Sequence, residues 1–400
     1  MVSRKTAWIV GLTGVTVTAV LCGCIIRNEW KEVQMLKKPE TTVSQPKTPQ
    51  PLPEEYEGEK IIVNSGSSET FADSILEDGK VKKEGQKLII DDNPVMYTYD
   101  NMEADIQMLL AGYPRWLTCE EIAKTVDRRS VYCLIIGNPQ AGQSILMGGG
   151  IHGREYMTSQ LVMKQTVAFL RHLEAGDSYH NVSYEKLLEN TAIYSIPMIN
   201  PDGVSISQKG MDGILTESVK EQIRNIAQLD GQQPEGSYLE RWKANAAGVD
   251  LNRNFDAQWQ EYQDPVGHPS SDHYKGTSPG SEPESAALIG LTEEKRFLRT
   301  VSYHTQGSVI YWYFGQEGQI YQDTFEFGQR IAGLTGYDMD ADISSLDPAG
   351  YKDWAISVFG IPSLTIEIGW DSSPVPPKQF EEIWKRNEYV WEETLLGVLE

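Results

Sequence analysis

Basic residues are scarce in this chain of 400 residues. Its 35 lysines and arginines stand against 57 aspartates and glutamates, which gives a formal net charge of −22. Nucleic acids and anionic lipid surfaces attract proteins that carry an excess of positive charge. The composition therefore argues against either one as the main partner of the folded part, and we expect no nucleic-acid partner.

Histidine and cysteine are also rare, with six and four residues. Beyond the N-terminal segment only Cys119 and Cys133 remain, on either side of a hairpin turn expected at Asp127 and Arg128. An oxidising compartment would allow a disulfide between them. Because a simple hairpin register does not place them directly opposite, the free and the bridged forms both stay open.

The first 27 residues form a predicted membrane-targeting segment. Arg4 and Lys5 precede residues 7–26, which carry no charge, and Arg27 ends the run. Residues 21–24 (LCGC) resemble the lipobox of bacterial lipoproteins, in which the last cysteine, here Cys24, is lipidated after cleavage. The alternative is an uncleaved single-pass anchor. Both predict a protein of the bacterial cell membrane whose folded part is extracytoplasmic.

Three further regions follow. Residues 28–60 contain five prolines among Lys, Glu, Thr and Gln, a composition that predicts a disordered tether. Residues 61–94 hold short apolar pieces between Gly and Asp, and we interpret them as a small preface packed on the main domain. Residues 95–400 are long enough to form that domain with a substantial core.

Apolar strands alternate with amphipathic helices along the main domain. A helix is expected from Tyr99, and Ser281 with Glu284 is expected to cap another helix around Pro283. Strands are expected at 121–124, 130–136, 144–148, 192–196, 299–303 and 363–366, helices at 157–170, 319–334 and from 377, and a long polar excursion at 204–248. This alternation predicts an α/β fold, with a sheet covered by helices on both faces.

Polar residues follow four of the predicted strands. His152, Asn200, His304 and Glu367 each stand at or just beyond a strand's carboxyl end. In open α/β sheets the ligand binds outside these ends. The four side chains are therefore expected to meet at one edge of the sheet.

A metal site is expected among these residues. His152 and Glu155, three residues apart, can turn toward one cation, although a solvated turn would explain this spacing alone. His304 completes two histidines and one carboxylate, a ligand set that leaves a fourth position open on catalytic zinc. Burial of Glu367 among apolar residues is costly unless a nearby cation compensates, which suits a general base.

Residues 248–255 (GVDLNRNF) add recognition chemistry. The planar fork of Arg253 matches a carboxylate, and Asn252 can add a donor. Asp250 could hold the far nitrogen of a metal-binding histidine and so fix its tautomer.

Together these motifs resemble the M14 metallocarboxypeptidase family, from residue 97 to the C-terminus. They are HGRE at 152–155, NPDG at 200–203, GVDLNRNF at 248–255, SYH at 302–304 and TIEIG at 365–369. The resemblance implies a three-layer α/β/α mixed sheet of the zinc carboxypeptidase type and one zinc ion per chain. It further implies that His152, Glu155 and His304 hold the zinc, that Glu367 is general base and acid, and that Asn252 and Arg253 bind the substrate's terminal carboxylate.

Within the family, the chain is similar to bacterial enzymes that cut the γ-D-glutamyl to diaminopimelate bond of peptidoglycan peptides. Lys243 stands where many members carry an arginine, and is our candidate for polarising the scissile carbonyl; the alternative is an exposed lysine. Tyr351 is the nearest counterpart of the family's mobile tyrosine. Lys352 stands where similar enzymes line the pocket after the scissile bond, and would favour a second carboxylate unless it is a surface lysine.

The sequence therefore predicts a tethered zinc peptidase acting on peptides or muropeptides of the cell wall. The alternative within the enzyme class is a carboxypeptidase that removes acidic C-terminal residues from ordinary peptides. A different class is a cell-wall binding protein that has kept the fold and lost the chemistry. An intact ligand set, base and carboxylate clamp together argue against this last reading.

Overall fold

The computed structural model describes residues 87–340 and 347–399. The predicted membrane segment, Cys24, the tether and most of the preface lie outside these residues. By its internal contacts the chain divides into Met1–Glu57 and Gly58–Glu400, and every described residue belongs to the second unit. Among the described helices, none combines the length and the apolar character needed to cross a membrane.

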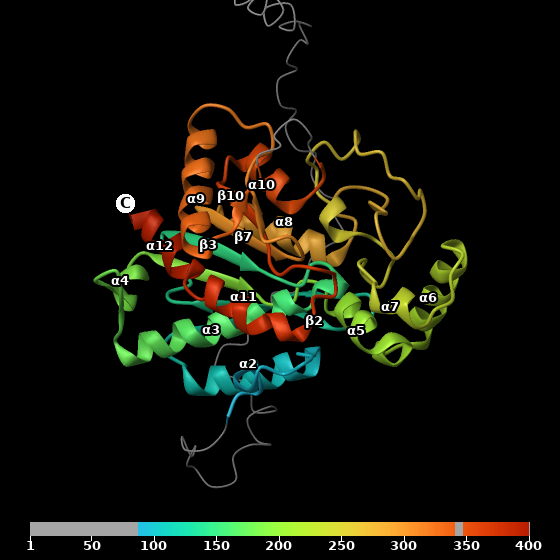
Figure 1. The fold of residues 1–400 in the computed structure, drawn as a ribbon, viewed down its shortest axis with the longest axis horizontal. Helices are drawn as coiled ribbons and strands as arrows, with labels where there is room; N and C mark the ends of the chain where they lie inside the picture. Colours follow the sequence, from blue (N-terminus) through green and yellow to red (C-terminus); the bar gives the residue numbers. More distant parts are fainter. Residues whose placement is uncertain (1–86, 341–346, 400) are drawn as a thin grey trace, which may run out of the picture. The chain divides into compact units, whose positions relative to one another are not determined.

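A mixed eight-stranded sheet lies at the centre of this unit (Figure 1). Its strands, in spatial order, are β1 (Leu117–Lys124), β2 (Ser130–Ile136), β6 (Thr191–Ile196), β3 (Gln143–Gly148), β7 (Arg299–His304), β10 (Ser363–Glu367), β8 (Val309–Tyr311) and β9 (Asp338–Met339). The central strands β6, β3, β7 and β10 are parallel. β1 and β2 form the antiparallel hairpin that the sequence predicted, and β8 runs antiparallel to β10.

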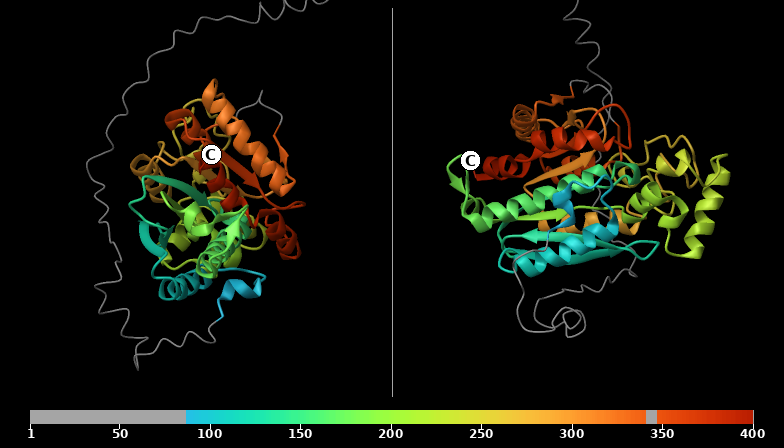
Figure 2. Two further views of the ribbon diagram at one scale, coloured as in Figure 1. Left: turned by 90° about the vertical axis from the view of Figure 1, so that its left-hand side faces the viewer. Right: turned by 60° about the horizontal axis from the view of Figure 1, so that its bottom comes forward.

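Helices cover both faces of the sheet, as Figure 2 shows from two further directions. The helices packed on the larger apolar cluster are α2 (Tyr99–Gly112), α3 (Met157–Ala175), α4 (Tyr184–Leu187), α9 (Gln319–Thr335), α11 (Phe380–Asn387) and α12 (Val390–Leu399). α8 (Pro283–Lys295) and α10 (Tyr351–Phe359) pack on the second cluster. Successive strand residues point to opposite faces, so Ile145 and Met147 enter the larger cluster and Leu146 the second. The predicted α/β class with a central mixed sheet is confirmed.

The expected polar excursion at 204–248 contains more structure than its composition indicated. Its elements are the end of α5 (Pro201–Lys209), α6 (Glu217–Leu229) and α7 (Ser237–Glu240). They enclose a separate apolar cluster, called here the satellite cluster, of Ile206, Ile214, Val219, Ile223, Ile226, Leu239, Trp242, Ala244 and Ala246. Val219, Ile223 and Ile226 of this cluster lie on one face of α6 at helical spacing, among many polar neighbours. This dilution made the segment resemble an irregular loop.

The predicted capping box at Ser281 and Glu284 is wrong. The N-cap of α8 is Glu282, without a side-chain cap bond, and Pro283 occupies the first turn. The Ser281 hydroxyl donates to Glu282 Oε1 at 2.9 Å and accepts from Asn254 Nδ2 at 3.0 Å. These tertiary contacts occupy the hydroxyl that a local cap would need.

Cys119 and Cys133 are both free thiols. In the hairpin register Cys119 faces Leu134, whereas Cys133 faces Glu120. The offset of one residue turns the two side chains to opposite faces, since Cys119 packs on the larger cluster and Cys133 lies inside the second. The bridged alternative is therefore not the one found.

Candidate active site

The four polar residues expected at strand ends are brought to one edge by the parallel strands β6, β3, β7 and β10. The turn after β3 is tied to the turn after β6, because Asn200 N donates to Gly150 O at 2.9 Å. Asn200 itself is a positioning residue. Its side-chain amide donates to Ile151 O at 3.1 Å and to Ala244 O at 3.0 Å.

Gly153 allows the closest approach in this region. A Cβ atom at this position would lie 2.4 Å from Gly203 O and 2.8 Å from Trp242 O, so a larger residue would force backbone apart. Gly153 N also donates to Lys243 O at 2.9 Å. The HGRE turn is therefore packed directly against both the NPDG helix start and the segment that carries Lys243.

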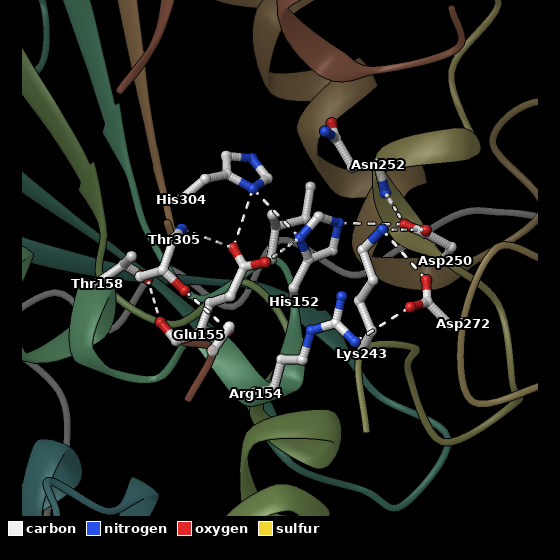
Figure 3. Close-up of polar contacts among 12 residues, drawn as sticks. His152, Arg154, Glu155, Thr158, Lys243, Asp250, Asn252, Asp272, His304 and Thr305 are labelled. Atoms are coloured by element: carbon white, nitrogen blue, oxygen red, sulfur yellow. Dashed lines mark hydrogen bonds and ion pairs between the residues drawn. The ribbon is translucent and has the colours of Figure 1, made fainter. Parts of the chain in front are cut away.

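The side chains of His152, Glu155 and His304 converge on one point (Figure 3). His152 Nδ1 lies 2.9 Å from Glu155 Oε1 and 3.2 Å from His304 Nδ1, and His304 Nδ1 lies 3.1 Å from Glu155 Oε2. All three residues are buried. Burial alone would raise the pKa of Glu155, but the two imidazoles hold it well below its ordinary value.

This donor set fits zinc. Two imidazole nitrogens that face each other at 3.2 Å need a proton or a cation between them, and two histidines with one carboxylate are a zinc ligand set. Asp250 Oδ1 lies 3.1 Å from His152 Nε2, the contact anticipated from the sequence. If Nε2 carries the proton, the Nδ1 lone pair is left for the metal.

Glu367 lies at the end of β10, directly beside His304 at the end of β7. Its Oε2 atom is buried and has no hydrogen-bond partner among the described residues. Burial, together with the neighbouring Glu155 carboxylate, raises the pKa of Glu367 to about 8, and the electrostatic effects of His304, Lys243 and Arg154 act in the opposite direction. A buried carboxylate with a free oxygen beside the ligand set has the position of a general base.

Lys243 is buried rather than exposed, which removes the alternative of a surface lysine. Its Nζ atom lies 2.8 Å from Asp250 Oδ2 and 3.2 Å from Asp272 Oδ1. Burial would lower the pKa of Lys243, but these two carboxylates raise it overall, so the ammonium keeps its charge. The charged ammonium of Lys243 therefore lies next to Asp250, the carboxylate that contacts His152.

A buried loop positions this lysine. Asn245 Oδ1 accepts from the backbone N–H groups of Ala247 and Val249, both at 3.0 Å. Asn245 Nδ2 donates to Glu282 Oε2 at 2.7 Å and to Glu284 Oε2 at 3.4 Å. Burial, followed by the charge of Asp202, raises the pKa of Glu284 to about 8. The start of α8 therefore anchors the turn between Lys243 and Asp250.

Asn252 and Arg253 lie on the short 3-10 helix η4 (Leu251–Arg253) that follows Asp250. Arg253 is buried, with Nη1 donating to Asn252 O at 2.8 Å and Nη2 paired with Asp347. Its Nε atom has no partner among the described residues. Asn252 Oδ1 accepts from Tyr351 N at 3.0 Å, which joins the start of α10 to this helix.

Tyr351 and Lys352 occupy different environments at the start of α10. The Tyr351 ring lies in the core, and its hydroxyl is 2.9 Å from the Thr292 hydroxyl, so the predicted substrate contact is not supported by this position. Successive residues of an α-helix point in different directions around its axis, and Tyr351 is on the side of α10 that faces α8. Lys352 is buried rather than on the surface: its Nζ donates to Tyr313 O at 3.1 Å and pairs with Asp353.

Three charged residues of the site were not singled out from the sequence. Arg154 donates from Nη1 to Asp272 Oδ2 at 3.1 Å. Asp272 thus bridges Arg154 and Lys243, whereas Asp347 pairs with Arg253. Arg154 stands inside the HGRE motif and could have been found there. No local pattern marks Asp272 or Asp347, since both meet their partners only through the fold.

Comparisons with known proteins agree with this geometry. A family model described as peptidase M14, zinc carboxypeptidase, matches residues 102–390. The uncharacterized protein YqgT of Bacillus subtilis is 30% identical over 303 residues, covering 75% of each chain. The gamma-D-glutamyl-L-diamino acid endopeptidase 1 of Lysinibacillus sphaericus is 30% identical over 290 residues, covering 72% of this chain and 69% of that protein.

Solved structures show the same fold. The structure of bovine thrombin-activatable fibrinolysis inhibitor matches with a TM-score of 0.58 at 17% identity, over 76% of this chain and 97% of that one. Carboxypeptidase A from Helicoverpa armigera matches with a TM-score of 0.56 at 20% identity, over 76% and 75%. With the matching family model, the convergent His-Glu-His site and this fold, the chain belongs to the M14 family of zinc carboxypeptidases.

Proposed function

We propose that this peptidase hydrolyses the γ-D-glutamyl to diaminopimelate bond of peptidoglycan peptides. The observation that carries the proposal is the pair of buried cations Arg253 and Lys352, which lie on neighbouring segments joined by the Tyr351 N to Asn252 Oδ1 bond. Two cations suit a leaving residue with two carboxylates, as diaminopimelate has. The endopeptidase from Lysinibacillus sphaericus, whose name states a gamma-D-glutamyl to L-diamino acid bond, supports a substrate of this class.

The proposed mechanism assigns one role to each residue of the site. His152, Glu155 and His304 would hold a single zinc ion, which when bound would supply Lewis-acid polarisation of the carbonyl and lower the pKa of water. The Glu367 carboxylate takes the proton of the attacking water and passes it to the leaving amine.

Two further groups act on the substrate itself. Lys243 stabilises the negative charge that develops on the carbonyl oxygen. Arg253, aided by Asn252, binds the carboxylate next to the scissile bond and fixes the substrate's register. Lys352 binds the second carboxylate.

The N-terminal region completes the proposal. We take residues 1–27 as the membrane anchor, lipidated at Cys24 or retained as a single span, and residues 28–60 as the tether. This arrangement holds the catalytic domain outside the cytoplasmic membrane, where cell-wall peptides occur.

The second candidate is a carboxypeptidase that removes acidic C-terminal residues from ordinary peptides, because Lys352 would also suit a glutamate side chain. Digestion of L-Ala-γ-D-Glu-meso-diaminopimelate, in parallel with an α-linked peptide that ends in glutamate, distinguishes the two by mass spectrometry. The proposal expects release of diaminopimelate and slow or undetectable release of glutamate. Preferred release of glutamate would support the second candidate, and the Glu367→Gln variant controls for contaminating peptidases.

A further inference from the structure

Asn252 and Arg253, the proposed binding site for the substrate carboxylate, are called here the clamp. In the structure Arg253 already pairs with a carboxylate of the chain itself. The Nη2 atom of Arg253 pairs with Asp347, while Nη1 is used by Asn252 O and Nε has no partner among the described residues. The Arg253 side chain is 10% exposed, whereas that of Asp347 is 73% exposed. A substrate carboxylate that takes the guanidinium fork must therefore come close to Asp347 or displace it.

Backbone hydrogen bonds hold the chain close to Asp347. The backbone two residues further on is fixed, because Ala349 N donates to Ala257 O at 2.8 Å and Phe255 N donates to Ala349 O at 3.1 Å. A displaced Asp347 side chain thus stays at the mouth of the clamp. Asp347 also lies within electrostatic reach of Tyr311 on β8, because its charge adds to the raised pKa of Tyr311 after burial, Glu367 and Asp340.

The second cation of the proposed pocket, Lys352, is also paired with a carboxylate of the chain. Lys352 pairs with Asp353 and donates to Tyr313 O, two residues beyond Tyr311. The two cations of the proposed pocket are therefore matched by two carboxylates. A leaving residue that brings only carboxylates adds uncompensated negative charge to this balanced pocket, and Asp347 is the more exposed source of the resulting repulsion.

Diaminopimelate differs from glutamate in this respect, because its distal end carries an ammonium as well as a carboxylate. We propose that Asp347 is a specificity-determining residue that binds the distal ammonium of diaminopimelate after the substrate's carboxylate has taken Arg253. The inference rests on the proposed function and deepens it: the pocket selects a zwitterionic side chain rather than an acidic one. Asp347 exchanges one cationic partner, Arg253, for another.

Two other roles of Asp347 would change the kcat/KM of both kinds of substrate equally. If Asp347 only competes with the substrate for Arg253, its removal frees the clamp for every substrate alike. If it only orients Arg253, its removal weakens every substrate alike. Selective loss for the ammonium-bearing substrate is expected only when Asp347 contacts that ammonium.

The test uses two peptides that differ in one group. Both begin with L-Ala-γ-D-Glu; one ends in meso-diaminopimelate and the other in 2-aminopimelate, which keeps the distal carboxylate and lacks the distal ammonium. The ratio of kcat/KM between them is measured for the full-length wild type and for Asp347→Asn. Glu317→Gln is the matched control, because it removes an exposed carboxylate from the nearby connection between β8 and α9.

We expect the wild type and the control to prefer diaminopimelate by about five- to tenfold, the range of a charge-assisted contact that substrate binding partly shields from water. In Asp347→Asn the ratio should fall to about one. Equal gains or equal losses for both peptides in this variant would overturn the inference, and so would an unchanged ratio. A wild type that cleaves both peptides without preference retains the proposed function and refutes this inference, whereas cleavage of neither peptide refutes both.

Discussion

Replacing Lys243 with methionine removes one buried positive charge while keeping nearly the same side-chain length. The lysine side chain is 9% exposed and lies between the carboxylates of Asp250 and Asp272. In the proposed mechanism its ammonium stabilises the developing oxyanion. If its only task were to neutralise Asp250, the folded variant would still turn over at the normal rate.

Two magnitudes separate these roles. Loss of one oxyanion donor lowers kcat by about 10²- to 10³-fold. Removing one partner of a buried ion pair typically destabilises a protein by about 3–5 kcal/mol. We expect the lower end here, because Asp272 is partly exposed and keeps Arg154 as a partner.

The assay therefore measures folding, metal content and turnover on the same samples. Urea unfolding followed by the fluorescence of the ten tryptophans gives stability, and steady-state cleavage of the diaminopimelate peptide gives kcat. The double variant Lys243→Met with Asp272→Asn should recover part of the stability and none of the turnover, whereas Lys243→Arg should retain most of the turnover. A Lys243→Met protein that is folded, contains zinc and has a kcat within about threefold of wild type would refute the oxyanion role.

Three other substitutions test the site. Glu367→Gln should lower kcat by about 10²- to 10⁴-fold with zinc still bound, so retained turnover in metal-replete protein would contradict the role of general base. Asp250→Asn should weaken zinc binding by about 10- to 100-fold in competition with a chelator, because the group that fixes the His152 ring changes; an unaltered affinity would mean that the contact is dispensable. Glu284 has a pKa raised by burial from its ordinary value of 4.5 to about 8, so its contribution to stability is present below pH 4.5 and is lost as the pH rises to 8. Glu284→Gln should therefore gain stability relative to wild type across this window, by at most about 1.4 kcal/mol per pH unit, and parallel stability profiles would argue against a buried neutral carboxyl.

Much of the fold followed from local sequence patterns. The runs that end at Gly148, Ile196, His304 and Glu367 are apolar enough to be recognised as buried strands, and a parallel arrangement then brings their ends together. That is why the candidate metal ligands and Glu367 could be expected at one edge of the sheet. Lys243 was named as a candidate catalytic residue from the sequence. Its burial between Asp250 and Asp272 was not predicted, because Asp272 is distant in sequence.

Contacts between distant segments explain the failures. Ser281 meets Asn254 and Glu282 instead of capping α8, and the Tyr351 hydroxyl meets Thr292 across two helices. The satellite cluster escaped notice because a single apolar face is diluted by the polar residues of α6. For Ser281 and Tyr351 the distant partners, Asn254 and Thr292, lie outside the window in which periodicity or capping is read.

The satellite cluster supports the Lys243 segment separately from the two apolar clusters that pack on the sheet. His304 and Glu367 end two strands of the sheet, and the candidate ligands His152 and Glu155 lie in the turn after β3. Lys243, in contrast, directly follows Trp242, a buried member of the satellite cluster. Opening of residues 204–248 would release the ammonium and would also remove the contact between Gly153 N and Lys243 O that holds the HGRE turn. Turnover should thus be lost at denaturant concentrations that leave the central sheet intact, so that enzymatic activity reports the local stability of this peripheral helical segment before global unfolding begins.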